Sequence, residues 1–219
     1  MDAVLKVGGS LAETPIFLKN LCLKINELCR KHSLFIVPGG SKFADTVRFF
    51  DREYQLPPAT SHKMALLAMD QYGMLLSTLI SNSVVSYELK PIKQKCGISI
   101  LLPSRHVFTE DPLPHSWKVT SDSIAAYVAI RLHTAKLILI TNVDGIYDKD
   151  PKNTPHAKLI KTLNVDSLSK FTQRTSVDRY LSKVLAESKL DCYVVNGMHP
   201  ERVEAILNNQ ETICTRIIP

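Results

Sequence analysis

The sequence contains no long hydrophobic run, although 45% of its 219 residues are hydrophobic. No apolar segment approaches the roughly 18–20 residues that a membrane-spanning helix needs. The first residues have an apolar strand pattern, which differs from the charged segment and apolar stretch of a secretory leader. We therefore expect no membrane partner and no secretory signal. The length suffices to bury a full core in one domain.

Cysteine is sparse and follows no metal-binding or redox motif. The five cysteines are scattered without a Cys-x-x-Cys pair, at Cys22, Cys29, Cys96, Cys192 and Cys214. The first two are seven residues apart, which places both on the apolar face of one predicted helix. An odd, scattered set argues against a disulfide framework and is typical of reduced thiols in a cytoplasmic protein.

Basic residues are not clustered, although the formal net charge is +6. No block of five or six lysines and arginines occurs, and aromatic residues do not alternate with basic ones as they do on single-strand nucleic-acid platforms. The excess positive charge is therefore assigned to solvated surface and to a few lysines of a site. We expect no nucleic-acid partner.

Strand and helix patterns alternate along the chain. Strands are predicted at 2–7, 34–37, 84–89, 98–102, 136–141, 191–195 and 213–217, and helices at 14–32, 41–51, 61–79, 122–133, 178–189 and 200–208. Strands separated by helices indicate a largely parallel sheet that is covered on both faces. The predicted fold class is therefore α/β, a three-layer α/β/α sandwich with a mainly parallel central sheet. Residues 83–118 are the least regular part of this pattern.

Two of the predicted helices carry further expectations. Ser41 is predicted to cap the N-terminus of the helix at 41–51. The helix at 61–79 has an apolar stripe that we expect to face the core or a subunit interface; the stripe consists of Met64, Leu67, Met69 and Met74.

Two glycine pairs each end a predicted strand, in Lys6-x-Gly8-Gly9-Ser10 and in Pro38-Gly39-Gly40-Ser41. Neither belongs to a GxxxxGK[ST] phosphate loop, and the dinucleotide motif GxGxxG is also absent. Strand-ending glycine turns in one sheet can present backbone N–H groups to one anion from two sides, and a helix N-terminus adds positive potential. With a nearby lysine, this pattern predicts an anion site and points to phosphoryl chemistry.

Two later segments carry further polar residues. Asp122 follows Thr120 and Ser121, either of which can cap the helix, and lies in a first turn where the dipole favours a carboxylate. Its small neighbours allow it to enter a crevice and pair with lysines. The loop at 141–155 permits two interpretations: a nucleotide site with a stacking tyrosine and carboxylates, or an Asp-Gly turn with solvated acids.

Five motifs, and their order along the chain, resemble those of the amino acid kinase superfamily. This superfamily includes acetylglutamate, aspartate, uridylate and isopentenyl phosphate kinases. The motifs are Lys6-x-Gly8-Gly9-Ser10, Pro38-Gly39-Gly40, Asp122-x-x-Ala125-Ala126, Thr141-Asn142-Val143-Asp144-Gly145-Ile146-Tyr147 and Lys183. The resemblance implies a single kinase domain over 1–219, with an acceptor lobe at about 1–118 and a nucleotide lobe at about 119–219. It also implies ATP and Mg²⁺ as cofactors and a homo-oligomeric, cytoplasmic enzyme, and no metal ligand is predicted in the chain.

The resemblance also implies residue roles. Lys6 and Lys183 would neutralise charge on the transferred phosphoryl group, and Asp122 would hold these lysines in place. Phosphate-binding N–H groups would come from Gly8, Gly9, Ser10, Gly39 and Gly40. The nucleotide would be bound by Thr141, Asn142, Asp144, Gly145, Tyr147, Asp148 and Pro151.

Three stretches are most similar to a short subgroup of this family, the kinases of methanofuran biosynthesis. These enzymes phosphorylate (5-(aminomethyl)furan-3-yl)methyl phosphate to its diphosphate. The stretches are 38–48, 65–73 and 114–122. Such an acceptor needs cations or a hydroxyl for its phosphate, a carboxylate for its ammonium and an aromatic ring for its furan. The predicted substrate residues are Ser41, Lys42, Arg48 and Lys118 for the phosphate, Asp45 or Asp178 for the ammonium, and Trp117 or Phe43 for the furan.

The chain departs from the family pattern in two places and leaves other functions open. Asp178-Arg179-Tyr180 stands where many relatives have Gly-Gly-Met before the second lysine, and Glu211-Thr212 replaces a Gly-Thr pair. The histidine that follows the second glycine turn in isopentenyl phosphate kinases is absent. Alternatives are an isopentenyl phosphate or nucleoside monophosphate kinase, or a non-catalytic nucleotide-binding storage or sensor protein. The presence of both lysines and Asp122 favours catalysis.

Overall fold

The protein is described by a computed structural model that covers residues 1–219 except 91–95, 152 and 172–174. The strands are β1 Ala3–Val7, β2 Ser33–Pro38, β3 Ser83–Ser86, β4 Gly97–Leu101, β5 Lys136–Thr141, β6 Thr162–Asn164, β7 Asp191–Asn196 and β8 Thr215–Ile218. The helices are η1 Gly9–Glu13 (a 3₁₀ turn), α1 Pro15–Leu28, α2 Ser41–Tyr54, α3 Pro58–Leu79, α4 Pro103–Glu110, α5 Ser121–Arg131, α6 Val165–Ser169, α7 Leu181–Ala186 and α8 Pro200–Leu207.

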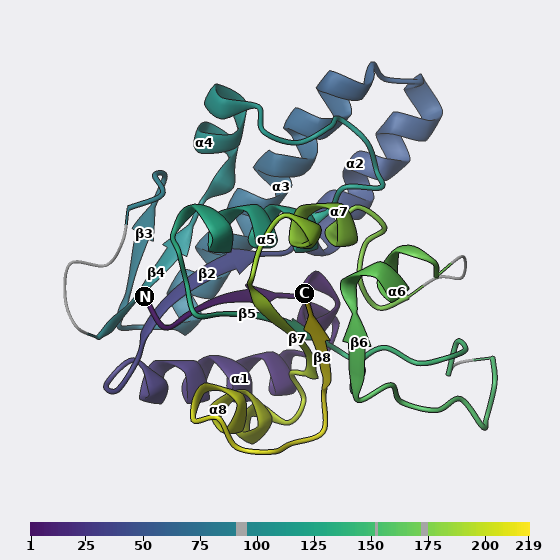
Figure 1. The fold of residues 1–219 in the computed structure, drawn as a ribbon. Coiled ribbons are helices and arrows are strands. Elements are labelled where there is room, and N and C mark those ends of the chain that lie inside the picture. The colour runs from purple at the N-terminus through teal and green to yellow at the C-terminus, as the bar shows by residue number, and fades with distance from the viewer. Residues whose placement is uncertain (91–95, 152, 172–174) are drawn as a thin grey trace.

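The described strands form one sheet in the order β3-β4-β2-β1-β5-β7-β8-β6. All neighbouring pairs are parallel except β7 and β8, which are antiparallel. Helices α1 and α8 cover one face, and α5 and α7 lie on the other (Figure 1). The predicted α/β three-layer fold with a mainly parallel sheet is therefore confirmed.

The side chains of β1 alternate between the two faces of the sheet, as pleating requires. Val4 packs in the core beneath α5, whereas Ala3, Leu5 and Val7 belong to the core beneath α1 and α8. Lys6 is two residues beyond Val4, so its side chain lies on the same face of the sheet, toward α5. The only polar side chain of this strand is thereby directed toward the N-terminus of α5.

Strands β2, β1 and β5 are adjacent, so their carboxyl ends meet at one edge of the sheet. Val7, the last residue of β1, is paired with Pro38 of β2 and with Ile140 of β5. Both glycine turns and the loop after residue 141 therefore leave the sheet side by side, where ligands bind in open parallel sheets.

Several local predictions differ from the structure. Ser41 does not cap α2: the N-cap residue is Gly40, and Ser41 has a left-handed φ of 50° within the helix start. The predicted helix at 178–189 is shorter, because the Asp178 carboxylate accepts hydrogen bonds from the N–H groups of Tyr180 and Leu181 and fixes the beginning of α7. Helix α4 was missed within the irregular segment at 83–118.

Thr120 is the N-cap of α5, with its side chain accepting from the Asp122 N–H. The five cysteines are free, and burial raises the pKa of the Cys22 thiol to about 12. Within the described part of the chain, no helix combines the length and the apolarity that a membrane crossing demands.

Candidate functional site

The two glycine turns are in direct contact. A β-carbon on Gly9 would lie 2.2 Å from the backbone nitrogen of Ser41, and one on Gly39 would lie 2.6 Å from the nitrogen of Gly9. Any larger side chain would therefore force the turns apart. The left-handed φ of Ser41 lies at this contact and is a conformation that non-glycine residues adopt only when their surroundings impose it.

The glycine N–H groups divide between the sheet and the site. The Gly8 N–H donates to the Ile140 carbonyl and the Gly39 N–H to the Val7 carbonyl, each at 2.8 Å. These two groups extend the sheet and are not available to a ligand. Gly9 and Ser10 begin η1, and Gly40 and Ser41 begin α2, where the first N–H groups of a helix have no intrahelical acceptor. Those are the donors that an anion can use.

Lys6 forms an ion pair with Asp122 beside the first turn. The ammonium nitrogen lies 2.8 Å from Asp122 Oδ1, and the two side chains are only 11% and 7% exposed. This oxygen is buried but accepts no regularly oriented hydrogen bond, so the ion pair is mainly coulombic. Lys6 Nζ also lies 3.6 Å from where a β-carbon on Gly8 would stand. The strand therefore places a cation beside the first of the two glycine turns.

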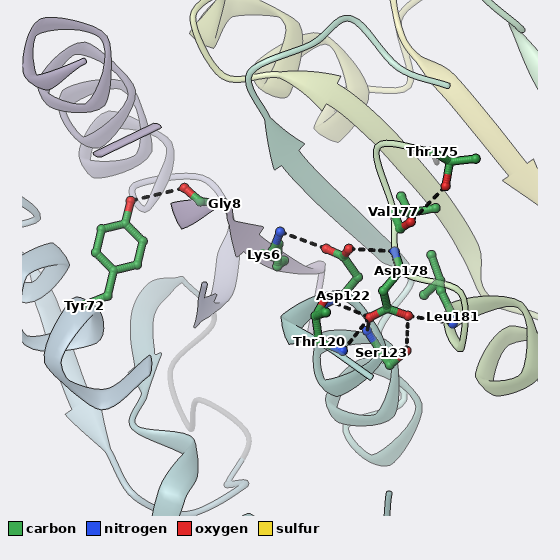
Figure 2. A network of polar contacts seen from close by, with 10 residues as sticks. All are labelled: Lys6, Gly8, Tyr72, Thr120, Asp122, Ser123, Thr175, Val177, Asp178 and Leu181. Carbon is green, nitrogen blue, oxygen red and sulfur yellow. Dashed lines mark hydrogen bonds and ion pairs between the residues drawn. The ribbon is translucent and has the colours of Figure 1, made fainter. Parts of the chain in front are cut away.

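Asp178 is at the centre of the polar network drawn in Figure 2. Its carboxylate accepts from the N–H and hydroxyl groups of both Thr120 and Ser123, at 2.6–3.0 Å, as well as from the start of α7. Its own N–H donates to Asp122 Oδ2 at 3.1 Å. Burial and the neighbouring Asp122 charge raise the pKa of Asp178, although the hydrogen bonds act in the opposite direction.

This network explains the departure from Gly-Gly-Met. The Asp178 side chain joins the N-terminus of α5 to the beginning of α7 and orients Asp122 through its backbone. Both of its oxygens are engaged within the protein, so the structure places it behind the ion pair and at the wall of a cavity.

Lys183 is not brought to the ion pair. It lies in the last turn of α7, is exposed, and has its Nζ 5.5 Å from the ring centroid of Tyr180. Among the described residues, no ion pair joins Lys183 to Asp122.

Tyr72 is a contributor that sequence reasoning missed. It is fully buried on α3, and its hydroxyl donates to the Gly8 carbonyl at 3.3 Å (Figure 2). Burial is the main cause that raises the pKa of this phenol, which keeps it a hydrogen-bond donor. A polar tip within a predicted apolar helix was the available signal.

Two adjoining cavities open beside the ion pair. The larger, about 870 Å³, lies between α3 and the segments at 115–122 and 175–179, and Asp122 is part of its wall. The smaller, about 340 Å³, is lined by both glycine turns, α2 and α3. His62, Ala65, Trp117, Val119 and Thr120 line both cavities.

The smaller cavity gathers several of the predicted acceptor residues. Ser41, Asp45 and Arg48 line it from α2, and Trp117 closes it from the segment before α5. Arg48 donates to Asp45 at 2.8 Å and its guanidinium lies 4.8 Å from the centroid of the Trp117 ring. A cation, an anion and a flat aromatic group therefore meet beside the glycine turns.

Asp51 fixes the orientation of Trp117. The indole N–H donates to Asp51 Oδ2 at 2.6 Å, and the Ser61 hydroxyl donates to the other carboxylate oxygen. These hydrogen bonds, first from Ser61 and then from Trp117, lower the pKa of Asp51. Sequence reasoning missed Asp51 because its partner is 66 residues away.

Three other predicted substrate residues lie away from this arrangement. Lys42 and Phe43 are exposed on α2 and line neither cavity, because Ser41, Ala44, Asp45 and Arg48 form the face of α2 that does. Lys118 is exposed and lines the larger cavity only.

The predicted nucleotide loop leaves β5 at Thr141, next to the glycine turns. Asp144 accepts from Arg202 at 2.6 Å and from Asn196 at 3.0 Å. Partial burial alone would raise the pKa of Asp144, but these hydrogen bonds outweigh it and hold the pKa below its ordinary value. Gly145 has a φ of 157°, and a β-carbon there would meet Thr215 Oγ1 at 2.4 Å.

The loop then forms a short turn of antiparallel chain. Tyr147 is bridged to Leu159, and the Asp148 carboxylate accepts from the Lys158 N–H at 2.7 Å. Asn142 is half-buried beside β5 and Pro151 is exposed at the far end. None of the residues predicted for the nucleotide lines the two cavities described above.

Comparison with known proteins identifies the family of this chain. Residues 1–196 match the model of the amino acid kinase family. The chain is 36% identical, over 98% of its length and 97% of the relative's, to a (5-(aminomethyl)furan-3-yl)methyl phosphate kinase of Methanocaldococcus jannaschii. It is 31% identical to a uridylate kinase of Methanococcus aeolicus, over 84% of this chain and 80% of the relative.

Solved structures support the fold. A uridylate kinase from Archaeoglobus fulgidus superposes with a TM-score of 0.79 at 23% identity, covering 99% of this chain and 100% of that one. An isopentenyl phosphate kinase from T. acidophilum gives a TM-score of 0.64 at 19% identity, with 99% and 100% covered. The chain therefore belongs to the amino acid kinase family and is a phosphotransferase.

Proposed function

We propose that this chain is an ATP-dependent kinase whose acceptor is a small phosphate ester, and that the acceptor is (5-(aminomethyl)furan-3-yl)methyl phosphate. In this reaction an acceptor phosphate oxygen attacks the γ-phosphorus of ATP. One P–O bond forms, the bond to ADP breaks, and the product is a phosphoanhydride. The 36% identical relative that carries this activity in its name supports the choice of acceptor.

The observation that carries the proposal is the buried Lys6–Asp122 ion pair beside the two abutting glycine turns. Phosphoryl transfer requires mostly positioning and neutralisation of charge on the oxygens of the transferred group. Lys6 supplies a fixed positive charge, and the free N–H groups at the start of η1 and α2 supply directed donors. The Lys6 ammonium also lies close to the first glycine turn, 3.6 Å from where a β-carbon on Gly8 would stand.

We assign the acceptor to the smaller cavity. The acceptor phosphate would lie against the N–H groups of Gly40 and Ser41, close to Arg48. The protonated aminomethyl group would pair with Asp45, and the furan ring would lie against Trp117. A volume of about 340 Å³ is sufficient for a molecule of that size.

The nucleotide would approach from the loop after Thr141, on the neighbouring strand end. Mg²⁺ would then enter with ATP, since this ion usually keeps several waters and binds through substrate phosphates. Both central carboxylates are already engaged within the protein, which fits binding of Mg²⁺ through the nucleotide. Asp122 is paired with Lys6, and Asp178 accepts hydrogen bonds from the beginnings of α5 and α7.

For Asp178 we propose a positioning role in place of direct contact with the acceptor ammonium. It fixes the N-terminus of α5 and thereby the Asp122 side chain. The catalytic role of Lys183 stays a prediction, because the helix carries it on an exposed surface.

We also propose a homo-oligomer that assembles through α3. Leu67 and Met74 of the predicted stripe are 48% and 52% exposed, whereas Met69 is buried. Leu75 on the same helix is 41% exposed, so the outer face of α3 retains apolar area that a second copy would cover. Reduced cysteines suit a cytoplasmic location for this assembly.

Uridylate kinase is the second candidate function, because a relative of that name is 31% identical over 84% of this chain. The two candidates differ in the acceptor's chemistry: a compact aminomethylfuran against a nucleoside with a ribose and a base. An isopentenyl phosphate acceptor has neither an ammonium for Asp45 nor an aromatic ring for Trp117.

Steady-state ADP release from Mg-ATP tests these alternatives, with the furan phosphate, UMP, AMP and isopentenyl phosphate offered in parallel. We expect the highest kcat/KM for the furan phosphate. Asp45→Asn should raise KM for that acceptor. If the wild type also phosphorylates UMP, the variant should phosphorylate UMP at the same rate. A preference for UMP would replace the proposed acceptor, and ATP binding without turnover of any acceptor would support a storage or sensor protein.

A further inference from the structure

Three side chains that have no role in the proposed phosphoryl transfer converge from three separate elements. They are His62 near the start of α3, Asp111 at the end of α4, and His115 in the segment that leads to α5. One ligand atom of each lies within 4.8 Å of the others. The two imidazole rings are stacked with centroids 4.6 Å apart and planes inclined by 23°.

One atom of this cluster lacks a partner. His62 Nε2 is buried, and no hydrogen-bonding group among the described residues reaches it. Buried polar atoms are nearly always paired, so an orphan ring nitrogen calls for an explanation. His115 Nε2, by contrast, lies 2.7 Å from Asp111 Oδ1. The ring that carries the orphan nitrogen therefore stacks on a histidine that is paired with a carboxylate.

We propose that His62, Asp111 and His115 bind one divalent transition-metal ion, of which Zn²⁺ is the best match. Two imidazole nitrogens and one carboxylate oxygen form a donor set that zinc uses with an open fourth position. Mg²⁺ prefers oxygen ligands and is a poor match for it. This site is separate from the Lys6–Asp122 ion pair and does not depend on the assignment of the acceptor.

The required movement is small. In a tetrahedral zinc site with bonds of about 2.0–2.2 Å, ligand atoms lie roughly 3.3–3.6 Å apart. The widest separation of the ligand atoms, at most 4.8 Å, must close by about 1.5 Å or less, whereas His115 Nε2 and Asp111 Oδ1, at 2.7 Å, must open by about 0.6–0.9 Å; rotation of the side chains can supply both movements. Asp111 is 59% exposed at the side chain, so its carboxylate has room to turn. His62 and His115 both line the larger cavity, which directs the fourth coordination position into it.

A metal ion at this site would link the segment between α4 and α5 to helix α3. The segment that follows α4 crosses α3 on its way to α5 (Figure 1), and it carries Trp117 only two residues beyond His115. The indole is already held at α2 through Asp51. A metal between His62 and His115 would add a second fixed point and stabilise the wall shared by the two cavities.

Metal binding to the untagged, metal-stripped full-length protein tests the proposal. Zn²⁺ titration by calorimetry and Co²⁺ titration by visible absorption should each give one equivalent, with the intense bands of tetrahedral Co²⁺. Zn²⁺ at about 100 times Kd should raise the midpoint of thermal unfolding by about 5–10 °C.

The variants are His62→Gln and His115→Gln, with His106→Gln as the matched control because His106 is a half-buried histidine of α4 outside the cluster. Removing a ligand should weaken Zn²⁺ affinity by about 100-fold or more, above the effect of changes in outer-shell groups. The control should bind zinc like the wild type. Wild-type protein without a stoichiometric site, or equal affinity in all variants, would overturn the proposal.

A third result would also overturn it: His62→Gln and His115→Gln weaken binding of the acceptor phosphate in metal-free buffer while no metal binds. The two histidines would then be anion ligands. Circular dichroism and the unfolding midpoint of each metal-free variant establish that it folds. His62→Asn is a second variant if His62→Gln does not fold.

Discussion

Replacement of Lys6 by methionine separates the stability of the site from its chemistry. Methionine keeps the length of the aliphatic stem and removes the ammonium, whose nitrogen lies 2.8 Å from Asp122 Oδ1. At that separation and an effective dielectric constant of about 20, the attraction is about 6 kcal/mol before any desolvation is counted. Removing one partner of a buried pair costs about 3–5 kcal/mol of unfolding free energy in measured cases.

The lower end of that range is expected for Lys6→Met. Asp122 keeps the hydrogen bond from the Asp178 N–H when the cation is gone. Urea unfolding followed by circular dichroism measures this loss. The double variant Lys6→Met/Asp122→Asn should be less destabilised than the sum of the single variants, because the two residues interact directly.

The effect on catalysis should be larger than any effect on ATP affinity. A fixed charge that acts on the transferred phosphoryl group contributes mainly in the transition state, so kcat should fall by about 100- to 1,000-fold or more. Lys24→Met is the matched control, since Lys24 pairs with Glu204 on the opposite face of the sheet at 3.3 Å. It should lose at most about 1 kcal/mol and keep its kcat.

A folded Lys6→Met enzyme with kcat within about threefold of the wild type would refute the role of Lys6. If Lys6→Met does not fold, Lys6→Arg retains the charge in a different geometry. A folded Lys6→Arg enzyme should still lose turnover, because a planar guanidinium cannot occupy the place of a point charge at the turn.

Three further predictions concern other parts of the molecule. Gly9→Ala places a β-carbon 2.2 Å from the Ser41 nitrogen, so it should separate the turns and abolish turnover, measured beside the thermal midpoint. Burial lowers the pKa of His106 in the folded state, so at falling pH the unfolded state binds a proton on this histidine before the folded state does. The unfolding free energy should therefore fall as the pH drops from above about 6.5 through the folded pKa, and it should fall less in His106→Gln. Leu67→Asp should shift the mass measured by light scattering toward the monomer without changing the fold.

The fold could be predicted from the sequence because its signals are local. The strand at Val4–Val7, the helix N-terminus at Thr120 and the two glycine turns are each encoded within a few residues. Alternation along β1 then fixed the side on which Lys6 emerges. The element at Pro103–Glu110 was missed because the prolines and polar residues around it weaken the helical pattern.

Much of the site depends on contacts between residues that lie far apart in the sequence. Asp178 has its main partners more than 50 residues away, and Asp51 meets Trp117 across 66 residues. Tyr72 reaches the Gly8 carbonyl across 64. No spacing rule in a single sequence predicts these contacts, since only packing of α2, α3 and the segment before α5 brings them together.

The most direct test of the proposed chemistry is ³¹P NMR of the complete reaction with Mg-ATP and (5-(aminomethyl)furan-3-yl)methyl phosphate. We expect the acceptor's single phosphate resonance to be replaced by two mutually coupled resonances of a phosphoanhydride, with one ADP formed per acceptor consumed and no such signals from Lys6→Met. Formation of ADP with inorganic phosphate alone, and an unchanged acceptor resonance, would contradict the assignment of this chain as a kinase for that phosphate ester.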